Sequence, residues 1–352
     1  MELKKLRGKI DKIDEGILAL LNQRAQEVIK VGKVKKANKI STYSPEREAS
    51  MLKRLKKINN GPFSSWDVED VFREILSICR SQRTTLAIAY LGPEGTFTHL
   101  AAIKKFGKKP NYISAESISD VFDKVDRGEA DYGVVPIENS IEGVVNYTLD
   151  MFFSSPLNIC AEVTLSISHV LIGTSLKDIK RVYSHPQVFP QCRKWISRFL
   201  KGVELVPTLS TAKAAQEAKK DLGGACIGNK ILANLYGLKI LSPAIEDSAS
   251  NYTRFLIIAK NDSPASGHDK TSLLFAVKDK VGALYHVLSS FKGCGVNLTK
   301  IESRPSKRKA WEYYFFVDIE GHKESAEVLK ALKALEKRCV FVKILGSYPR
   351  ES

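Results

Sequence analysis

Apolar residues in the first part of the chain recur every three or four positions. One such stripe consists of Leu3, Leu6, Ile10, Ile13, Ile17 and Leu20. The pattern continues towards Val31 without a proline and is typical of an amphipathic helix with a heptad-like face. A helix of this length needs partner helices or a second chain to cover its stripe.

Two shorter helices are predicted after this one. Pro45 can begin a helix that runs to about Ile58, where Asn-Asn-Gly-Pro at 59–62 ends it. Ser64 or Ser65, followed by acidic residues, caps a third helix that ends near Arg83. Residues 1–84 are therefore predicted to form an all-helical segment.

The pattern changes between residues 85 and 262. Short β-rich runs such as LAIAYL, YGVVPI and RFLIIA alternate with helical stretches such as SISDVFDKVDRG and PQCRKWISRFLK. This alternation predicts an α/β fold, and the segment is long enough for two lobes.

A polar linker at 263–270 precedes the last segment, residues 271–352. Its elements follow the order βαββαβ, which predicts a small ferredoxin-like sandwich. The chain is thus expected to be a multi-domain protein with an all-α, a two-lobed α/β and a ferredoxin-like part.

Composition narrows the class of protein. Of the 352 residues, 43% are apolar and 27% are charged, the balance of a soluble globular protein. No apolar run reaches the ~20 residues of a membrane span, and the N-terminus does not resemble a signal peptide. The six cysteines are scattered without a CxxC pair, so we expect a reducing, cytoplasmic location and no zinc ribbon or disulfide framework.

The net charge of +16 suggests an anionic partner. Residues 1–83 hold 19 Lys and Arg against 11 Asp and Glu, so half of the excess lies in about a quarter of the chain. Nucleic acid is one possibility, but the chain lacks a recognisable reading motif and a basic-aromatic platform. We therefore expect small acidic substrates and neither nucleic acid nor a membrane as partners.

Cations on the first helix suggest an anion pocket. Arg24 follows Leu20 on the apolar stripe, and Lys35 lies about 20° from Arg24 around the helix. Arg7 points elsewhere and could serve a second chain, while Arg47 and Glu48 open the second helix. A solvated basic helix is the simpler alternative.

At these residues the segment resembles the AroQ family of chorismate mutases, through LRGKIDKIDEGILALLNQR, VGKVK, SPERE and VFREILSICRSQR. The resemblance implies an intertwined dimer in which Arg24, Lys35, Arg47 and Glu48 of one chain, with Arg7 of the other, hold chorismate. Cys79 and Arg83 stand where the family usually has a small polar residue and a Gln or Glu. A slip of register could bring Gln82 to the ether oxygen, or Arg83 could act as the donor there, and the mutase activity would be reduced or altered.

Four stretches of the central segment carry polar side chains near strand ends. They contain Thr98 after GPEGTF, Glu138 and Asn139 in PIENS, Ser184 and Gln191 in SHPQVFPQ, and Thr253 in YTRF. Helix capping and turns explain each stretch taken alone. His99, His169 and His185 lack metal-site spacing, so we expect local hydrogen bonds there and no metal.

Together these stretches are similar to prephenate dehydratase across nearly all of 86–260. The resemblance implies two α/β lobes, like those of a periplasmic binding protein, with the site in the cleft between them. Thr253 would be the leading catalytic residue, with Asn139, Ser184 and Gln191 nearby and Glu138 and Thr98 as further candidates. Prephenate loses CO₂ and water, a reaction in which neutral donors orient the substrate and no cofactor is needed.

The last segment resembles an ACT domain of the phenylalanine-sensing type, through GAL and ESRP within βαββαβ order. Taken alone, these residues fit a tight turn and an edge strand. The resemblance implies that L-phenylalanine binds between two such domains. The implied binding residues are Gly282, Ala283, Leu284, Asn297, Leu298, Glu302, Ser303 and Arg304.

The three resemblances imply domains at 1–84, 85–262 and 271–352. They imply an enzyme that converts chorismate to prephenate and prephenate to phenylpyruvate, with feedback inhibition by L-phenylalanine, in a homodimer or homotetramer. Two alternatives remain open: a dehydratase whose helical segment only dimerises, and a non-catalytic sensor of a small acid.

Overall fold

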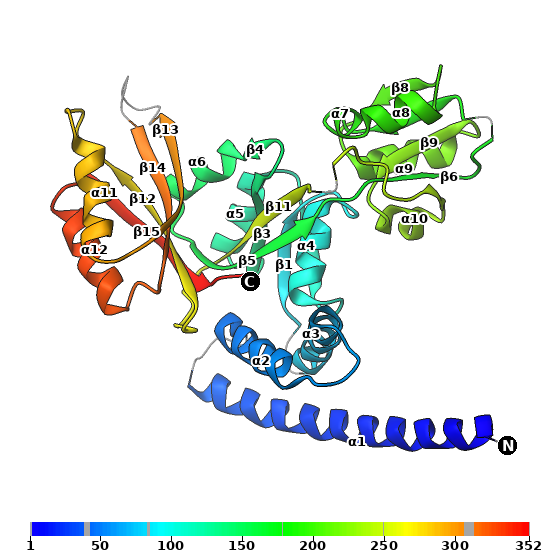
Figure 1. Ribbon diagram of the computed structural model, residues 1–352, viewed down its shortest axis with the longest axis horizontal. Coiled ribbons are helices and arrows are strands. Elements are labelled where there is room, and N and C mark those ends of the chain that lie inside the picture. Colours follow the sequence, from blue (N-terminus) through cyan, green and yellow to red (C-terminus); the bar gives the residue numbers. More distant parts are fainter. Residues whose placement is uncertain are drawn as a thin grey trace.

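The computed structural model describes residues 2–38, 43–82, 85–177, 179–248, 250–305 and 313–351. Three helices come first: α1 (Glu2–Ala37), α2 (Pro45–Ile58) and α3 (Ser65–Ser81). Ser64 caps α3, since its Oγ accepts from Asp67 N at 3.1 Å while Ser64 N donates to the Asp67 carboxylate at 2.8 Å. α1 contacts α3 and runs past the outside of the α2–α3 pair (Figure 1).

The central sheet has the order β2-β1-β3-β11-β5, with the short β4 (Gly143–Val144) paired to β3. Its strands are β1 (Ala87–Leu91), β2 (Asn111–Ala115), β3 (Tyr132–Asn139), β5 (Asn158–Ser166) and β11 (Tyr252–Ala259). β1, β2 and β3 are parallel, whereas β11 is antiparallel to both β3 and β5. Helices α4 (Phe97–Phe106), α5 (Ile118–Asp126) and α6 (Asn146–Ser154) pack on this first lobe.

A second lobe stands apart from the first (Figure 1). Its sheet has the order β10-β6-β9-β7-β8. The strands are β6 (Val170–Gly173), β7 (Arg181–Ser184), β8 (Glu204–Pro207), β9 (Gly224–Gly228) and β10 (Lys239–Ser242), and the helices are α7 (Val188–Gln191), α8 (Arg193–Phe199), α9 (Thr211–Lys220) and α10 (Ile231–Tyr236).

The chain passes between the lobes twice, after β5 and before β11. The two crossovers lie side by side, because Ile167 N donates to Asn251 O at 2.8 Å and Ile245 N donates to His169 O at 2.9 Å. The two crossover segments therefore hold each other in place at the junction of the lobes.

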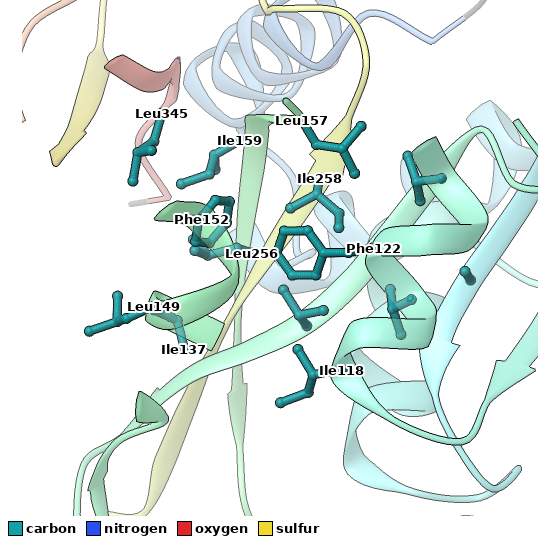
Figure 2. Close-up of a cluster of buried hydrophobic side chains, with 14 of the residues drawn as sticks. Ile118, Phe122, Ile137, Leu149, Phe152, Leu157, Ile159, Leu256, Ile258 and Leu345 are labelled. Carbon is teal, nitrogen blue, oxygen red and sulfur yellow. The ribbon is translucent and has the colours of Figure 1, made fainter. Parts of the chain in front are cut away.

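The C-terminal part is the expected βαββαβ sandwich. It comprises β12 (Asp269–Ala276), α11 (Ala283–Gly293), β13 (Leu298–Pro305), β14 (Tyr313–Glu320), α12 (Ala326–Glu336) and β15 (Phe341–Pro349), in the sheet order β13-β14-β12-β15. Leu345 packs with Phe152 and Ile159 in one buried cluster (Figure 2). Phe316 belongs to the same cluster, so this sheet shares a core with the first lobe.

The predicted fold class and element order are confirmed, with three local differences. α1 continues to Ala37, and the helix expected over 190–201 is divided at Cys192 into α7 and α8. β12 begins at Asp269, inside the linker predicted at 263–270. None of the described helices is long and apolar enough to cross a membrane.

Candidate functional site

Asn139 and Thr253 lie opposite each other where β3 and β11 pair. Asn139 Nδ2 donates to Thr253 Oγ1 at 2.8 Å and to Asn251 Oδ1 at 2.7 Å. The sequence motifs PIENS and YTRF are therefore brought together, although they lie more than a hundred residues apart.

The orientation of the Asn139 amide is fixed by the turn that follows β3. Its Oδ1 accepts from Ile141 N and Glu142 N, both at 2.9 Å, so its NH₂ group must face Thr253. Thr253 Oγ1 is then an acceptor from Asn139. Within the described residues its own hydroxyl hydrogen has no acceptor, which leaves that proton available to a bound molecule.

A second amide carries the network into the other lobe. Asn251 is buried, and its Nδ2 donates to Gln191 Oε1 at 2.9 Å at the end of α7. Gln191 Nε2 in turn donates to Glu142 Oε1 at 3.2 Å, back in the first lobe. We call Asn139, Asn251, Thr253 and Gln191 the amide–hydroxyl cluster; it spans the junction of the two lobes.

His169 completes this junction from the first crossover. Its Nε2 lies 3.0 Å from Gln191 Oε1, and because that oxygen only accepts, the Nε2 must carry the proton. Burial lowers the pKa of His169, which favours the neutral ring. The His169 and Phe97 rings are nearly perpendicular, with their centroids 5.5 Å apart.

The GPEGTF turn of the first lobe contacts the second lobe. Asn229 Nδ2, after β9, donates to Gly95 O at 2.6 Å. Gly95 has φ +88°, and a Cβ there would lie 2.5 Å from Leu232 of the second lobe. Only glycine permits this approach, so the turn acts first as an inter-lobe contact.

Three predicted residues lie outside the amide–hydroxyl cluster. Ser184 is fully buried, and its hydroxyl donates to Ile227 O at 2.8 Å between β7 and β9. Thr98 is buried in the first turn of α4, and in the described ranges its hydroxyl makes no hydrogen bond. The Glu138 carboxylate lies on the other side of β3, where it pairs with Arg254 at 2.6 Å and with Lys300.

The predicted mutase residues form an incomplete arrangement in one chain. Lys35 Nζ donates to Ser44 Oγ at 2.5 Å, and Glu48 pairs with Arg80, which lies over the Tyr43 ring at 4.9 Å. Arg24 is half-buried, and its Nη1 has no hydrogen-bond partner in the part of the chain that is described. The remaining two described candidates, Arg7 and Arg47, are exposed, and Arg83 lies outside the described residues.

The predicted phenylalanine residues lie on two neighbouring elements of the C-terminal sandwich. Gly282 caps α11 with φ 77°, and Ala283 and Leu284 form its first turn. The other five lie on or next to β13. Asn297 comes just before the strand, Leu298 begins it, and Glu302, Ser303 and Arg304 are near its end. Arg304 also reaches the first lobe, with its Nη2 3.1 Å from Asp150 Oδ1.

Sequence reasoning missed Asn251 and the connecting roles of His169 and Glu142. Asn251 lies two positions before Thr253, and alternate strand residues share a face, so strand periodicity was the available signal. No group of three His, Cys, Asp or Glu side chains in the described ranges is arranged to hold a metal ion.

Comparison with known proteins gives matches over all three parts. The family model for prephenate dehydratase matches residues 88–263, that for chorismate mutase type II residues 6–84, and that for the ACT domain residues 271–337. A bifunctional chorismate mutase/prephenate dehydratase of Aquifex aeolicus is 47% identical over 355 residues, covering 99% of this chain and 98% of the relative.

Solved structures agree for the two C-terminal parts. A prephenate dehydratase from Arthrobacter aurescens in complex with L-Phe is 34% identical, with a TM-score of 0.70 over 75% of this chain and 90% of that one. GqqA, described as a novel type of quorum quenching acylase, is 28% identical, with a TM-score of 0.69 over 75% of this chain and 98% of that one. The full-length match at 47% identity decides the assignment: this chain belongs to the family of bifunctional chorismate mutase/prephenate dehydratases.

Proposed function

We propose that this protein converts chorismate to prephenate with its helical segment, 1–84, and prephenate to phenylpyruvate with its two-lobed segment, 85–262. L-Phenylalanine, bound at 271–352, is the feedback inhibitor. The observation that carries the dehydratase assignment is the amide–hydroxyl cluster, in which groups from three separate stretches of sequence meet at one inter-lobe junction.

Dehydration of prephenate needs one proton donor. The ring carboxylate leaves as CO₂, and its bonding electrons enter the ring. The ring C–O bond then breaks, and the departing hydroxide takes up a proton to leave as water. The product ring is aromatic, which supplies the driving force, so the enzyme has to orient the substrate and assist the leaving group.

Thr253 is the residue best placed to assist. Because its oxygen already accepts from Asn139, its hydroxyl hydrogen points away from that amide and can be donated to the leaving hydroxyl. Asn139 is held by two backbone N–H groups and serves to fix Thr253. Gln191 and Asn251 hold the second lobe in register with this pair.

Neutral donors suit the group that departs as CO₂. A cation against that carboxylate would stabilise the ground state and oppose its loss. The cluster consists of amides and one hydroxyl, and the nearby Arg254 and Lys300 are turned to the opposite side of the strands. Ser184 supports the ends of β7 and β9 through its hydrogen bond to Ile227 O. We place Ser184 and Thr98 near the site, without direct contact with the substrate.

The helical segment needs a second copy of the chain. The stripe residues of α1 are about half exposed or more, from Ile17 at 49% to Leu20 at 67%. Such a face on a 36-residue helix is covered in a homodimer or homotetramer. Arg24, Lys35, Arg47 and Glu48 would then hold the chorismate dianion together with Arg7 from the second copy.

The C-terminal sandwich is assigned the phenylalanine site. Gly282, Ala283 and Leu284 lie at the start of α11. Asn297, Leu298, Glu302, Ser303 and Arg304 lie just before or along the edge strand β13. An edge strand is a natural contact with a second copy, which supports a ligand site between two such domains.

Assays on the purified protein test these assignments separately. Chorismate is supplied first and prephenate second, each with and without L-phenylalanine, and prephenate and phenylpyruvate are measured. We expect phenylpyruvate from both substrates and less of it with phenylalanine. Phenylpyruvate from prephenate alone would leave the helical segment as a dimerisation module, and none from either substrate would leave a sensor of a small acid.

A further inference from the structure

Six charged side chains form a cluster between the central sheet and the C-terminal sheet. Its members, called the junction cluster below, are Arg254, Lys270, Lys300, Glu138, Glu162 and Asp318. Three are cations and three are anions, so the junction cluster is neutral as a whole. Except for Glu138, the side chains are 12% exposed or less. Buried ions of this kind must stay paired, because removing one partner leaves an unpaired charge in a poorly solvated environment.

Arg254 is at the centre of the junction cluster and bridges two domains. Its Nε lies 2.6 Å from Glu138 Oε1 and its Nη1 lies 3.2 Å from Glu162 Oε2, both in the first lobe. The same Nη1 lies 2.8 Å from Asp318 Oδ2, on β14 of the C-terminal sheet.

Two lysines from the C-terminal sheet complete the junction cluster. Lys300 of β13 pairs with Glu138, and Lys270 of β12 pairs with Glu162 at 2.9 Å. Each domain therefore supplies charges that the other domain neutralises. The relative position of the two sheets and the charge balance of the junction cluster cannot change independently.

The junction cluster lies directly behind the dehydratase residues. On the paired strands, Glu138 is opposite Arg254, and the next pair is Asn139 opposite Thr253. Successive residues of a strand point to opposite faces. One pair faces the C-terminal domain and the adjacent pair faces the inter-lobe junction, so a shift of the backbone at one pair moves the other.

Lys300 is the contact most easily released. Its partner Glu138 is 33% exposed at the side chain, whereas Glu162 and Asp318 are 3% and 1% exposed. Lys300 also lies on β13, between Leu298 and Glu302, two of the residues assigned to phenylalanine. A ligand that displaces β13 would displace Lys300 with it.

We propose that Lys300 and Arg254 are positioning residues for dehydration, and that the Lys300–Glu138 contact couples the C-terminal domain to Asn139 and Thr253. With the contact made, β3 and β11 are held in the active arrangement; phenylalanine favours the state in which it is broken. The inference rests on the proposed function. A ligand can shift such an equilibrium only through different affinities for the two states, so a mutation that breaks the contact should lower the rate and favour phenylalanine binding.

The test is Lys300→Met in the full-length protein, which keeps the side-chain length and removes the charge. We expect kcat for prephenate to fall about three- to tenfold without phenylalanine. Phenylalanine binding, measured by calorimetry, should be kept and should become tighter, because the state that phenylalanine favours is already populated. Inhibition by saturating phenylalanine should be largely lost, and Lys300→Arg should restore both the rate and the inhibition.

Lys323→Met is the matched control. Lys323 also reaches across the same domain boundary, to Asp262, but Asp262 follows the opposite end of β11 from Thr253. We expect wild-type rate, binding and inhibition from this variant. Equal effects of both lysine variants would overturn the proposal, because any loosening of the boundary would then suffice.

The other outcomes are equally decisive. Normal inhibition in Lys300→Met would overturn the coupling, and loss of phenylalanine binding would place Lys300 in the ligand site instead. If Lys300→Met does not fold by circular dichroism, Glu138→Gln provides the same test from the first lobe and should also lose inhibition. A wild-type protein that forms no phenylpyruvate would refute the proposed function itself, a result distinct from all of these.

Discussion

The two candidate catalytic regions are built in opposite ways. The amide–hydroxyl cluster is neutral, half-buried or buried, and its groups hydrogen-bond to one another within a single chain. The helical segment presents cations along α1, leaves Arg24 Nη1 buried without a partner among the described residues, and exposes the apolar stripe. The first region is complete as it stands, and the second is half of a structure.

The difference corresponds to the chemistry of the two reactions. Loss of CO₂ is hindered by a cation at the departing carboxylate, so its site can be made from neutral groups that one folded chain holds in place. Rearrangement of a dianion in a compact conformation requires several fixed cations. These cations repel one another, and the negative charge of the bound ligand offsets the repulsion. Cations from two chains that meet around the ligand satisfy this requirement.

The largest effect is expected from Thr253→Ala. Removing the hydroxyl removes the proposed donor, so phenylpyruvate formation from prephenate should fall about 10²–10⁴-fold in kcat. Mutase activity should not change, because Thr253 belongs to the lobe junction and not to the helical segment. Stopped-flow or absorbance assays with each substrate measure the two activities.

Thr253→Ser is the control for that change, since it keeps the hydroxyl and should retain most of the activity. Full dehydratase activity in Thr253→Ala would show that another group assists the leaving hydroxyl. Equal loss of both activities would show that the two regions are not independent.

The next largest effect is expected from charge on the α1 stripe. Ile10→Glu combined with Ile17→Glu places two carboxylates on the face that a second copy would cover. We expect dissociation, seen by analytical ultracentrifugation, and at least a hundredfold loss of mutase activity. Dehydratase activity should stay within about threefold, because its cluster lies within one chain.

A substitution on the opposite, solvated side of α1, such as Lys12→Glu, controls for the change of charge. An unchanged assembly state in the stripe variant would show that α1 is not the interface. Loss of both activities would show that the dehydratase site also depends on the second copy.

Much of the architecture could be predicted because it depends on local sequence. The stripe of α1, the cap at Ser64 and the alternation of strands and helices each depend on neighbouring residues. The meeting of Asn139, Gln191 and Thr253 was predicted only through resemblance to a family, since no local signal places residues a hundred positions apart. The structure brings these three together through Asn251.

The position of Glu138 could not be predicted for a physical reason. Glu138 and Asn139 are adjacent, and strand geometry requires them to face opposite ways, but only the packing of the C-terminal sheet decides which one meets the site. Ser184 is similar: its place at the end of β7 was predicted, but its burial against Ile227 depends on how β9 packs. Tertiary contacts determine both side chains.

A smaller effect is expected from Asn251→Ala. The substitution removes one acceptor from Asn139 and one donor to Gln191, both at a position with 1% exposure. Unpaired polar groups left in such a place cost about 1–3 kcal/mol in the free energy of unfolding, and kcat for prephenate should fall about tenfold. Urea unfolding and steady-state kinetics measure the two quantities.

Asn158→Ala is the matched control. Within the described residues, the one hydrogen bond of its side chain is to Lys260 O at 3.1 Å, at the far end of the same pair of strands. It should change kcat by less than twofold. If Asn251→Ala loses stability but keeps its kcat, Asn251 supports the fold only and the inter-lobe network does not reach Thr253.

The smallest effect is expected from the titration of His169. Burial lowers its pKa in the folded protein below the ordinary value of about 6.5, so above that pH the ring is neutral in both the folded and unfolded states. As the pH falls below about 6.5, the unfolded chain binds the proton first, and the free energy of unfolding drops by at most about 1.4 kcal/mol per pH unit. His169→Gln can still donate to Gln191 but cannot titrate, so its stability should fall less steeply with acid.

Urea unfolding of the wild type and of His169→Gln between pH 8 and pH 5 measures this difference, and the values at pH 8 serve as the internal reference. Parallel curves would show that His169 takes up its proton equally in both states, and that the inter-lobe junction tolerates a charged ring.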